Sequence, residues 1–135
     1  MKKFGTLILL GLLVLTACGN NASSSDASPM PLATVPPEFA GKTNPLDANA
    51  ATEGANVFKA NCATCHGEKG AGDGIASQSL DSKPANLVNL SRQVDDDYLF
   101  WRISEGKPGT SMVAWKGILT EEQIWQAVTF IRTLK

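Results

Sequence analysis

The segment 61–67, NCATCHG, contains two of the chain's three cysteines and its only histidine. Two thiols and an imidazole within five consecutive residues can form a metal site, a disulfide or the attachment point of a covalent cofactor. The rest of the chain has to distinguish these three possibilities.

Length and charge limit the kind of protein that carries this segment. The chain has 135 residues, enough for one small domain, and such domains are often reinforced by a disulfide, a metal or a cofactor. Its formal charge is −1; without Lys2 and Lys3, which lie in a segment that we expect to be removed, 10 basic and 13 acidic residues remain. A mildly acidic chain without a basic cluster is not expected to bind nucleic acid.

The amino terminus has the pattern of an export signal. Two lysines precede a nearly unbroken apolar run, Phe4 to Leu15, which is too short to cross a bilayer comfortably. Residues 15–18, LTAC, resemble a bacterial lipobox, which implies removal of the signal peptide 1–17 and lipidation of Cys18. The alternative is an ordinary signal peptide that leaves Cys18 as a free thiol, and an exported free thiol is prone to oxidation. We therefore expect a lipid-anchored protein at the cell membrane that faces the periplasm or extracytoplasmic space.

Residues 18–51 read as the lipidated cysteine followed by a tether. The stretch is rich in Pro, Ser, Ala and Asn, a composition that predicts an extended, flexible linker. A part of it, Val35 to Leu46, can alternatively lie along a partner. The folded domain is predicted to span residues 52–135.

Three helices are predicted in that domain. Thr52 is placed to cap a helix that runs to Ala60, immediately before the cysteine segment. The acidic run 95–97 opens a second helix that ends at Gly106. Residues 120–123, TEEQ, form a capping box for a third helix with apolar residues at helical spacing up to Leu134. No stretch alternates like a strand, so the predicted fold class is all-α.

The cysteine segment favours covalent haem over its alternatives. A disulfide between Cys62 and Cys65 would close a very small loop and stabilise little. A zinc site would have three ligands where structural zinc uses four, and a thioredoxin-like redox pair would need a neighbouring strand. In C-x-x-C-H the two cysteines bind the haem vinyl groups as thioethers, and His66 reaches the iron through Nε2.

Beyond this motif, residues 52–134 resemble the class I monohaem cytochromes c. Members of that family cross their first and last helices at a glycine and an aromatic residue, and Gly54, Phe58 and Phe130 stand at those places. The loop 70–74, GAGDG, also resembles that of short bacterial members, although Ile75 replaces their usual proline. The resemblance implies a small three-helix fold around one haem c. It also implies a backbone carbonyl that accepts a bond from the axial histidine, and the sequence does not identify that carbonyl.

The sixth iron ligand is predicted to be Met112. His66 is the only histidine, Met1 leaves with the signal peptide, and Met30 lies in the tether. The alternative interpretation of Met112 is a core methionine that fills space.

The residues around Met112 match the family only in part. The family places its distal methionine in a segment that often reads Met-Pro-x-Trp; here Val113 replaces the proline and Trp115 is retained. Trp115 is expected to contact the haem or one of its propionates. Lys107, Lys116, water and an open position remain as alternative sixth ligands.

The predicted ligands imply one-electron transfer rather than catalysis. An iron bound by His66 and Met112 has no free position for a substrate, and the methionine sulfur favours the ferrous state, so the reduction potential is expected well above zero. We expect a respiratory electron carrier, or a complex subunit, between a quinol-oxidising complex and a downstream acceptor. The small cytochrome subunit of alternative complex III is one family member of this kind. The runner-up is a haem enzyme or gas sensor with an open sixth position.

A docking role for the acidic run 95–97, toward a basic partner, is a further possibility. Helix amino termini favour acidic residues in any case, and this explanation is preferred.

Overall fold

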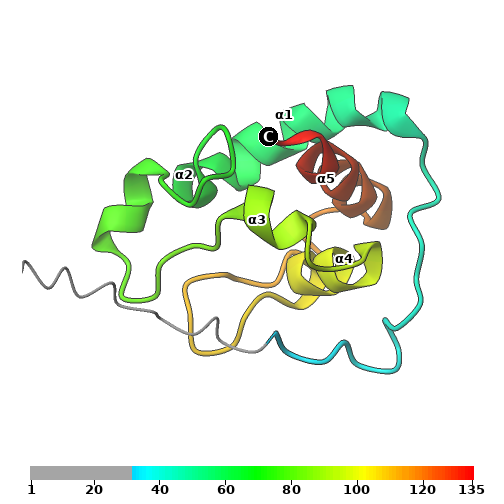
Figure 1. The fold of residues 1–135 in the computed structure, drawn as a ribbon, viewed down its shortest axis with the longest axis horizontal. Helices are drawn as coiled ribbons and strands as arrows, with labels where there is room; N and C mark the ends of the chain where they lie inside the picture. Colours follow the sequence, from blue (N-terminus) through cyan, green and yellow to red (C-terminus); the bar gives the residue numbers. More distant parts are fainter. Residues whose placement is uncertain (1–31) are drawn as a thin grey trace, which may run out of the picture. The chain divides into compact units, whose positions relative to one another are not determined.

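The computed structural model describes residues 32–135, so the predicted signal peptide, Cys18 and the first part of the tether lie outside the described residues. The described elements are all helical (Figure 1): η1 Ala48–Ala50, α1 Ala51–Asn61, α2 Ala63–His66, η2 Ile75–Ser79, α3 Leu87–Ser91, α4 Asp96–Glu105 and α5 Glu121–Thr133. Within residues 32–135 the only β-type pairing is an isolated bridge between Lys116 and Leu119. The predicted all-α fold class is therefore confirmed. None of the described helices has the length and apolar character that a membrane-spanning helix needs.

Helix α5 forms as its sequence predicts. The Thr120 hydroxyl accepts a bond from the Gln123 N–H at 3.1 Å, and the Gln123 side chain accepts one from the Thr120 N–H at 2.9 Å. This reciprocal pair satisfies two backbone donors that the helix itself cannot satisfy. Ile124, Val128 and Ile131, which follow at helical spacing, are buried in the core.

Helices α1 and α5 cross at Gly54, as the family resemblance implies (Figure 1). A Cβ atom at Gly54 would lie 2.7 Å from the carbonyl carbon of Gln126 and 2.9 Å from Cβ of Phe130, so the backbones approach each other as only glycine permits. Next to the crossing, the rings of Phe58 and Phe130 pack with their centroids 5.1 Å apart. This crossing fixes the helix that leads into the cysteine segment.

The start of α1 differs from the prediction. The helix begins at Ala51, and Thr52 lies in its first turn rather than at the N-cap, which is Ala50 and has no side-chain bond. The capping interaction lies upstream, where Asp47 accepts a bond from the Asn49 N–H at 2.8 Å and starts η1. Because η1 already turns the chain, α1 continues from it without a separate cap.

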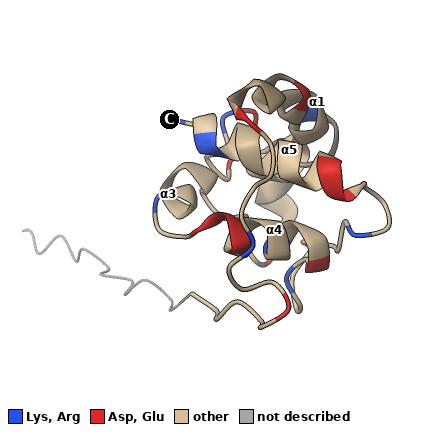
Figure 2. Cartoon of the chain, turned by 90° about the vertical axis from the view of Figure 1, so that its right-hand side faces the viewer, with Lys and Arg blue, Asp and Glu red and all other residues tan. Residues whose placement is uncertain are grey.

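Helix α4 begins and ends close to the predicted positions, and its acidic start is used within the fold. Asp96 forms an ion pair of 2.7 Å with Arg132 of α5. Arg132 also donates to the carbonyl oxygens of Ser91 and Val94, so it joins α5 to the segment between α3 and α4. Asp97 accepts a bond from the Gly41 N–H at 2.8 Å. These internal contacts support a structural role for the acidic run. Helix α5 likewise begins with acidic residues in its first turn (Figure 2).

Residues 33–50, which we call the N-terminal strap, pack against the domain. The sequence predicted a flexible tether up to residue 51, but Phe39 is only 8% exposed and belongs to the core, with Val35 and Leu46 packed beside it. The reason is that these three apolar side chains are separated by prolines and polar residues, so composition alone conceals them. The folded unit begins at about residue 33 rather than at 52.

Candidate haem-binding site

The cysteine segment lies on one continuous helical turn. Cys62 ends α1, where its N–H donates to the Phe58 carbonyl at 2.8 Å. The Cys62 carbonyl then accepts bonds from the N–H groups of Cys65 at 3.1 Å and His66 at 2.9 Å, which starts α2. The structure therefore brings the two predicted thioether cysteines and the predicted iron ligand together on helical backbone, without a neighbouring strand.

The glycine loop that follows holds this turn from the other side. The Gly72 N–H donates to the His66 carbonyl at 2.8 Å, and the Gly74 N–H donates to the Cys65 carbonyl at 3.1 Å. A Cβ atom on Gly74 would lie 2.6 Å from the Ala63 carbonyl oxygen, so a larger residue would push the loop off the turn. The loop thus satisfies carbonyl groups that a short helix leaves without partners.

The structure identifies the carbonyl that the sequence could not. Nδ1 of His66 lies 3.0 Å from the backbone oxygen of Ala85. A carbonyl oxygen only accepts, so Nδ1 carries the proton and the Nε2 lone pair is left for a metal. The Ala85 segment is held in place by the Leu87 N–H, which donates to the Gly70 carbonyl at 2.7 Å. Burial lowers the pKa of His66, so the imidazole is neutral and able to bind iron at neutral pH.

Both cysteines are free and half-buried. Burial, and then the neighbouring Cys65, raise the pKa of the Cys62 thiol to about 12. A thiol with this pKa is protonated at neutral pH, which does not suit an attacking redox cysteine. In the part of the chain that the structure describes, no three His, Cys, Asp or Glu side chains gather where they would bind a metal ion. The zinc and redox alternatives thus gain no support.

The Met112 segment is attached to the end of α4. The N–H groups of Trp115 and Lys116 donate to the carbonyls of Ile103 and Ser104, each at 3.1 Å. The Met112 carbonyl accepts a bond from the Lys107 N–H at 2.9 Å. In Figure 1 this segment lies on the same side of the domain as α2. Met112 and Trp115 are both half-buried. The hydrogen bonds named above involve only their backbone groups, so they do not engage either side chain.

Arg102 of α4 is a candidate site residue that the sequence reasoning missed. Its Nε atom is buried without a hydrogen-bond partner among residues 32–135. Its guanidinium lies 3.8 Å from the ring centroid of Trp101, and one nitrogen is 3.5 Å from the Gly106 carbonyl. A half-buried guanidinium with an unused, buried Nε–H donor fits an anion, and the propionates of haem are carboxylates. The sequence signal that could have identified Arg102 is its position beside the apolar face of the helix that leads to Met112.

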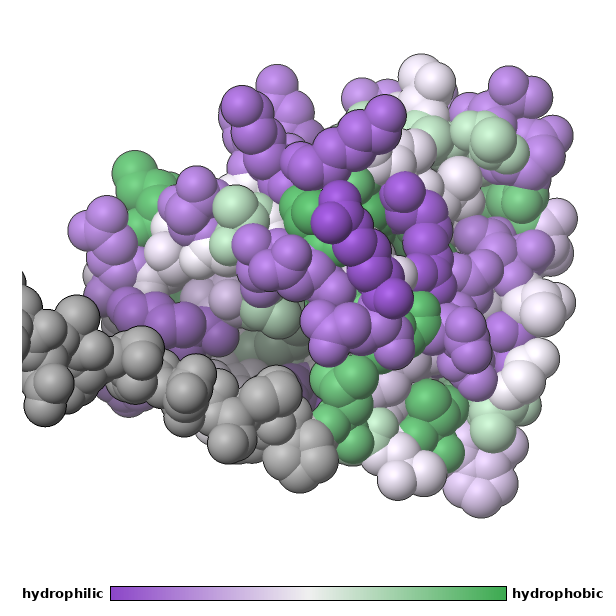
Figure 3. Space-filling model, in the orientation of Figure 1, coloured by the Kyte–Doolittle hydropathy of each residue, from purple (hydrophilic) through white to green (hydrophobic). Residues whose placement is uncertain are grey.

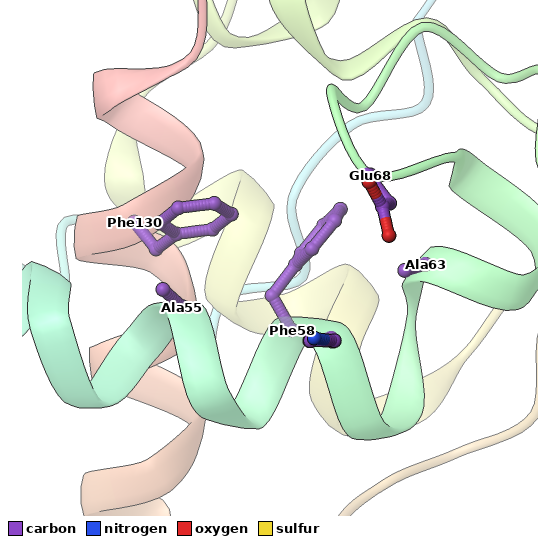
Figure 4. Close-up of a pocket in the computed structure, with 6 residues that line it drawn as sticks. Ala55, Phe58, Ala63, Glu68 and Phe130 are labelled. Atoms are coloured by element: carbon purple, nitrogen blue, oxygen red, sulfur yellow. The ribbon is translucent and has the colours of Figure 1, made fainter.

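A surface hollow of about 220 Å³ lies next to the cysteine turn, between α1, α2 and α5 (Figure 4). It is lined by Ala55, Phe58, Lys59, Ala63, Glu68 and Phe130. Phe58 and Phe130 form its apolar wall in the close-up, and Glu68 stands at its rim. Arg102, whose Nε is the one buried side-chain polar atom without a partner among residues 32–135, does not line it.

Comparison with known proteins indicates the family of the chain. Residues 49–131, more than half of the chain, match the family described as cytochrome C oxidase, cbb3-type, subunit III. The chain is 37% identical over 95 residues to the cbb3-type cytochrome c oxidase subunit FixP of Azorhizobium caulinodans, covering 67% of this chain and 29% of FixP. It is 31% identical over 80 residues to cytochrome c6 of Euglena gracilis, covering 59% of this chain and 87% of that protein.

A solved structure supports the same assignment. A chain of the reducing HAO-like protein complex of Kuenenia stuttgartiensis is 40% identical, with a TM-score of 0.55, over 60% of this chain and 40% of that one. The chain thus spans less than a third of FixP but most of cytochrome c6. The predicted cofactor, covalent haem c, is confirmed. The chain belongs to the c-type cytochrome family described as cytochrome c oxidase, cbb3-type, subunit III.

Proposed function

We propose that this protein is a membrane-tethered monohaem cytochrome that passes electrons from a quinol-oxidising complex to a downstream acceptor. The observation that carries the proposal is the bond between His66 Nδ1 and the Ala85 oxygen, because it fixes the tautomer whose Nε2 lone pair would be free to bind iron. The membership of the chain in a family named for an oxidase subunit agrees with a respiratory role.

Four residues of the chain would hold the haem. Cys62 and Cys65 would form the two thioether bonds, and His66 and Met112 would be the axial ligands. Bound haem supplies reversible one-electron exchange at its iron. The Met112 sulfur is a soft, neutral donor, so it would favour the reduced state and raise the potential. With both axial positions taken by side chains, no substrate binds at the iron, and the protein acts as a relay rather than an enzyme.

Two further residues would contact the edge of the haem. Arg102 would donate its buried Nε–H to a propionate, which would remove the cost of leaving that donor unsatisfied. Trp115, three residues after Met112, would contact the haem or the other propionate; the bond from its backbone to Ile103 fixes its position on α4.

A lipid on Cys18 would hold the protein at the membrane. Two or three acyl chains anchor a protein durably where one does not. The strap shortens the connection, because the residues between Cys18 and the folded unit number about 15 instead of about 33. At ~3.5 Å per extended residue the domain would stay within about 50 Å of the membrane surface. This short reach favours a partner in the same membrane, such as the small-subunit position in alternative complex III.

The decisive experiment combines spectroscopy with native purification. We expect the oxidised protein to show the weak near-infrared band of sulfur–iron ligation and the reduced protein to bind CO slowly. Met112→Leu should retain covalently bound haem on a haem-stained gel, lose the band and bind CO fast. Fast CO binding by the unmodified protein would instead indicate an open sixth position, as in a haem enzyme or gas sensor.

The anchor and the partner are tested in native membranes. Cys18→Ser should move the cytochrome from the membrane to the soluble exported fraction, while the unmodified protein should purify with integral redox subunits. An unmodified protein that is recovered without lipid in the soluble fraction would refute the anchor. Recovery from membranes without any integral subunit would indicate a free carrier.

A further inference from the structure

The N-terminal strap, residues 33–50, is attached to α4 and α5 through aromatic contacts. The ring of Phe39 packs against Phe100 of α4, with centroids 6.2 Å apart. Phe100 in turn stacks on Trp125 of α5, with centroids 4.1 Å apart and an interplanar angle of 21°. All three rings are at least 92% buried, so the strap extends the core between the two helices.

Polar bonds hold the same short stretch of the strap. Asn44 donates through Nδ2 to the Trp125 carbonyl at 3.2 Å and to the Thr129 hydroxyl at 2.9 Å, both on α5. On the α4 side, the Gly41 N–H donates to the Asp97 carboxylate at 2.8 Å. Three strap residues within the stretch 39–44, Phe39, Gly41 and Asn44, therefore bind α4 and α5 at once.

The Met112 segment is hydrogen-bonded to the same helix, α4, about one turn beyond the strap contact at Phe100. Phe100, the contact of the strap, is three residues before Ile103, whose carbonyl accepts the bond from Trp115. The next carbonyl, that of Ser104, accepts the bond from Lys116. Because α4 is short and hydrogen-bonded throughout, it moves as one unit, and a shift at Phe100 displaces these two anchoring carbonyls.

We propose that the strap is a positioning element for the sixth ligand: through Phe39 and Asn44 it holds α4 on α5 and so keeps the Met112 segment in place. The inference rests on the proposed role of Met112 as an iron ligand. The strap is thus a working part of the electron-transfer domain and not only a spacer to the membrane. When the contacts of the strap are lost, the Met112 sulfur dissociates from the haem iron more often, while the haem stays attached through Cys62 and Cys65.

The test compares four variants of the full-length, haem-containing protein: Phe39→Ala, Asn44→Ala, Phe39→Leu and Phe130→Ala. The last is the matched control, because Phe130→Ala removes the same ring at the α1–α5 crossing, where it packs on Phe58 and not on the ring of Phe39. Three quantities are measured: the rate of CO binding to the reduced protein, the temperature at which the near-infrared band disappears, and the temperature at which helical circular dichroism is lost.

We expect Phe39→Ala and Asn44→Ala to bind CO at least about tenfold faster, because a minor ligand-off state becomes more populated. Their near-infrared band should disappear well below the temperature of helix loss. Phe39→Leu should stay close to the unmodified protein, since the site remains filled. Phe130→Ala should lower both temperatures together and leave the CO rate unchanged at 25 °C.

Unchanged CO rates in both strap variants, or a band that disappears only with the helices, would overturn the inference. So would an equal acceleration in Phe130→Ala, because it would show a general loss of stability. If Phe39→Ala does not fold, Asn44→Ala gives the answer, because it removes the strap's bonds to α5 without removing a core ring. Failure of the proposed function is recognised separately, by fast CO binding and an absent band in the unmodified protein.

Discussion

Replacing Gly54 by alanine should destabilise the domain, although the same change stabilises most helices. At an exposed helical position, alanine is favoured over glycine by about 0.5–1 kcal/mol. At Gly54 the new Cβ would lie 2.7 Å from the carbonyl carbon of Gln126 and 2.9 Å from Cβ of Phe130, where ordinary contacts are 3.4–4 Å. The sign of the effect should therefore be reversed.

The magnitude follows from the separation that the helices must undergo. Restoring ordinary contact requires α1 and α5 to move apart by roughly half an ångström or more, and overpacking of this kind costs about 1–3 kcal/mol. The blocking groups belong to the backbone of α5 and to a Cβ, so no side-chain rotation relieves the contact. After subtraction of the gain in helix propensity, we expect a net loss of about 1 kcal/mol, compared with the ~5–15 kcal/mol of a typical domain.

Urea unfolding of the haem-containing protein, followed by circular dichroism, provides the assay. With a slope of about 1–3 kcal/mol per molar, the midpoint should fall by about 0.5 M. Ala60→Gly, at an exposed position of the same helix, is the control for helix propensity alone. Gln126→Ala should not rescue Gly54→Ala, because it leaves the Gln126 carbonyl in place. A Gly54→Ala protein as stable as the unmodified one would refute the close approach.

Three further changes test other parts of the structure. Arg132→Leu removes the ion pair with Asp96 and two bonds to carbonyls, and should lower the free energy of unfolding by about 2 kcal/mol in urea titrations, with Asp96→Asn costing less. Thr120→Ala should cost about 1 kcal/mol in the same measurement while Thr120→Ser costs little, and equal effects would exclude a capping role. Arg102→Leu should keep covalent haem but shift the pH dependence of the reduction potential toward neutral pH, since loss of a nearby cation raises the pKa of a propionate. Arg102→Lys should shift the pH dependence less, and identical curves for the variants and the unmodified protein would place the propionates elsewhere.

Much of the fold was predictable because its signals are local. The capping box of α5 lies within four consecutive residues, and the helix starts where those residues place it. The start of α1 was predicted two residues late, since Thr52 looked like a cap while η1 had already turned the chain. The strap was not predicted, because its apolar side chains are few and lie among prolines. Their burial depends on the faces that α4 and α5 present after folding.

The sequence by itself determined the cofactor. Two thiols and an imidazole on one helical turn need no tertiary contact to come together, so the C-x-x-C-H spacing already specifies haem attachment. The tertiary structure decided what surrounds that turn: the Ala85 oxygen 19 residues from His66, the unused donor of Arg102 and the strap on α4. These features join segments far apart in the chain, and only the packing of the helices sets their distances.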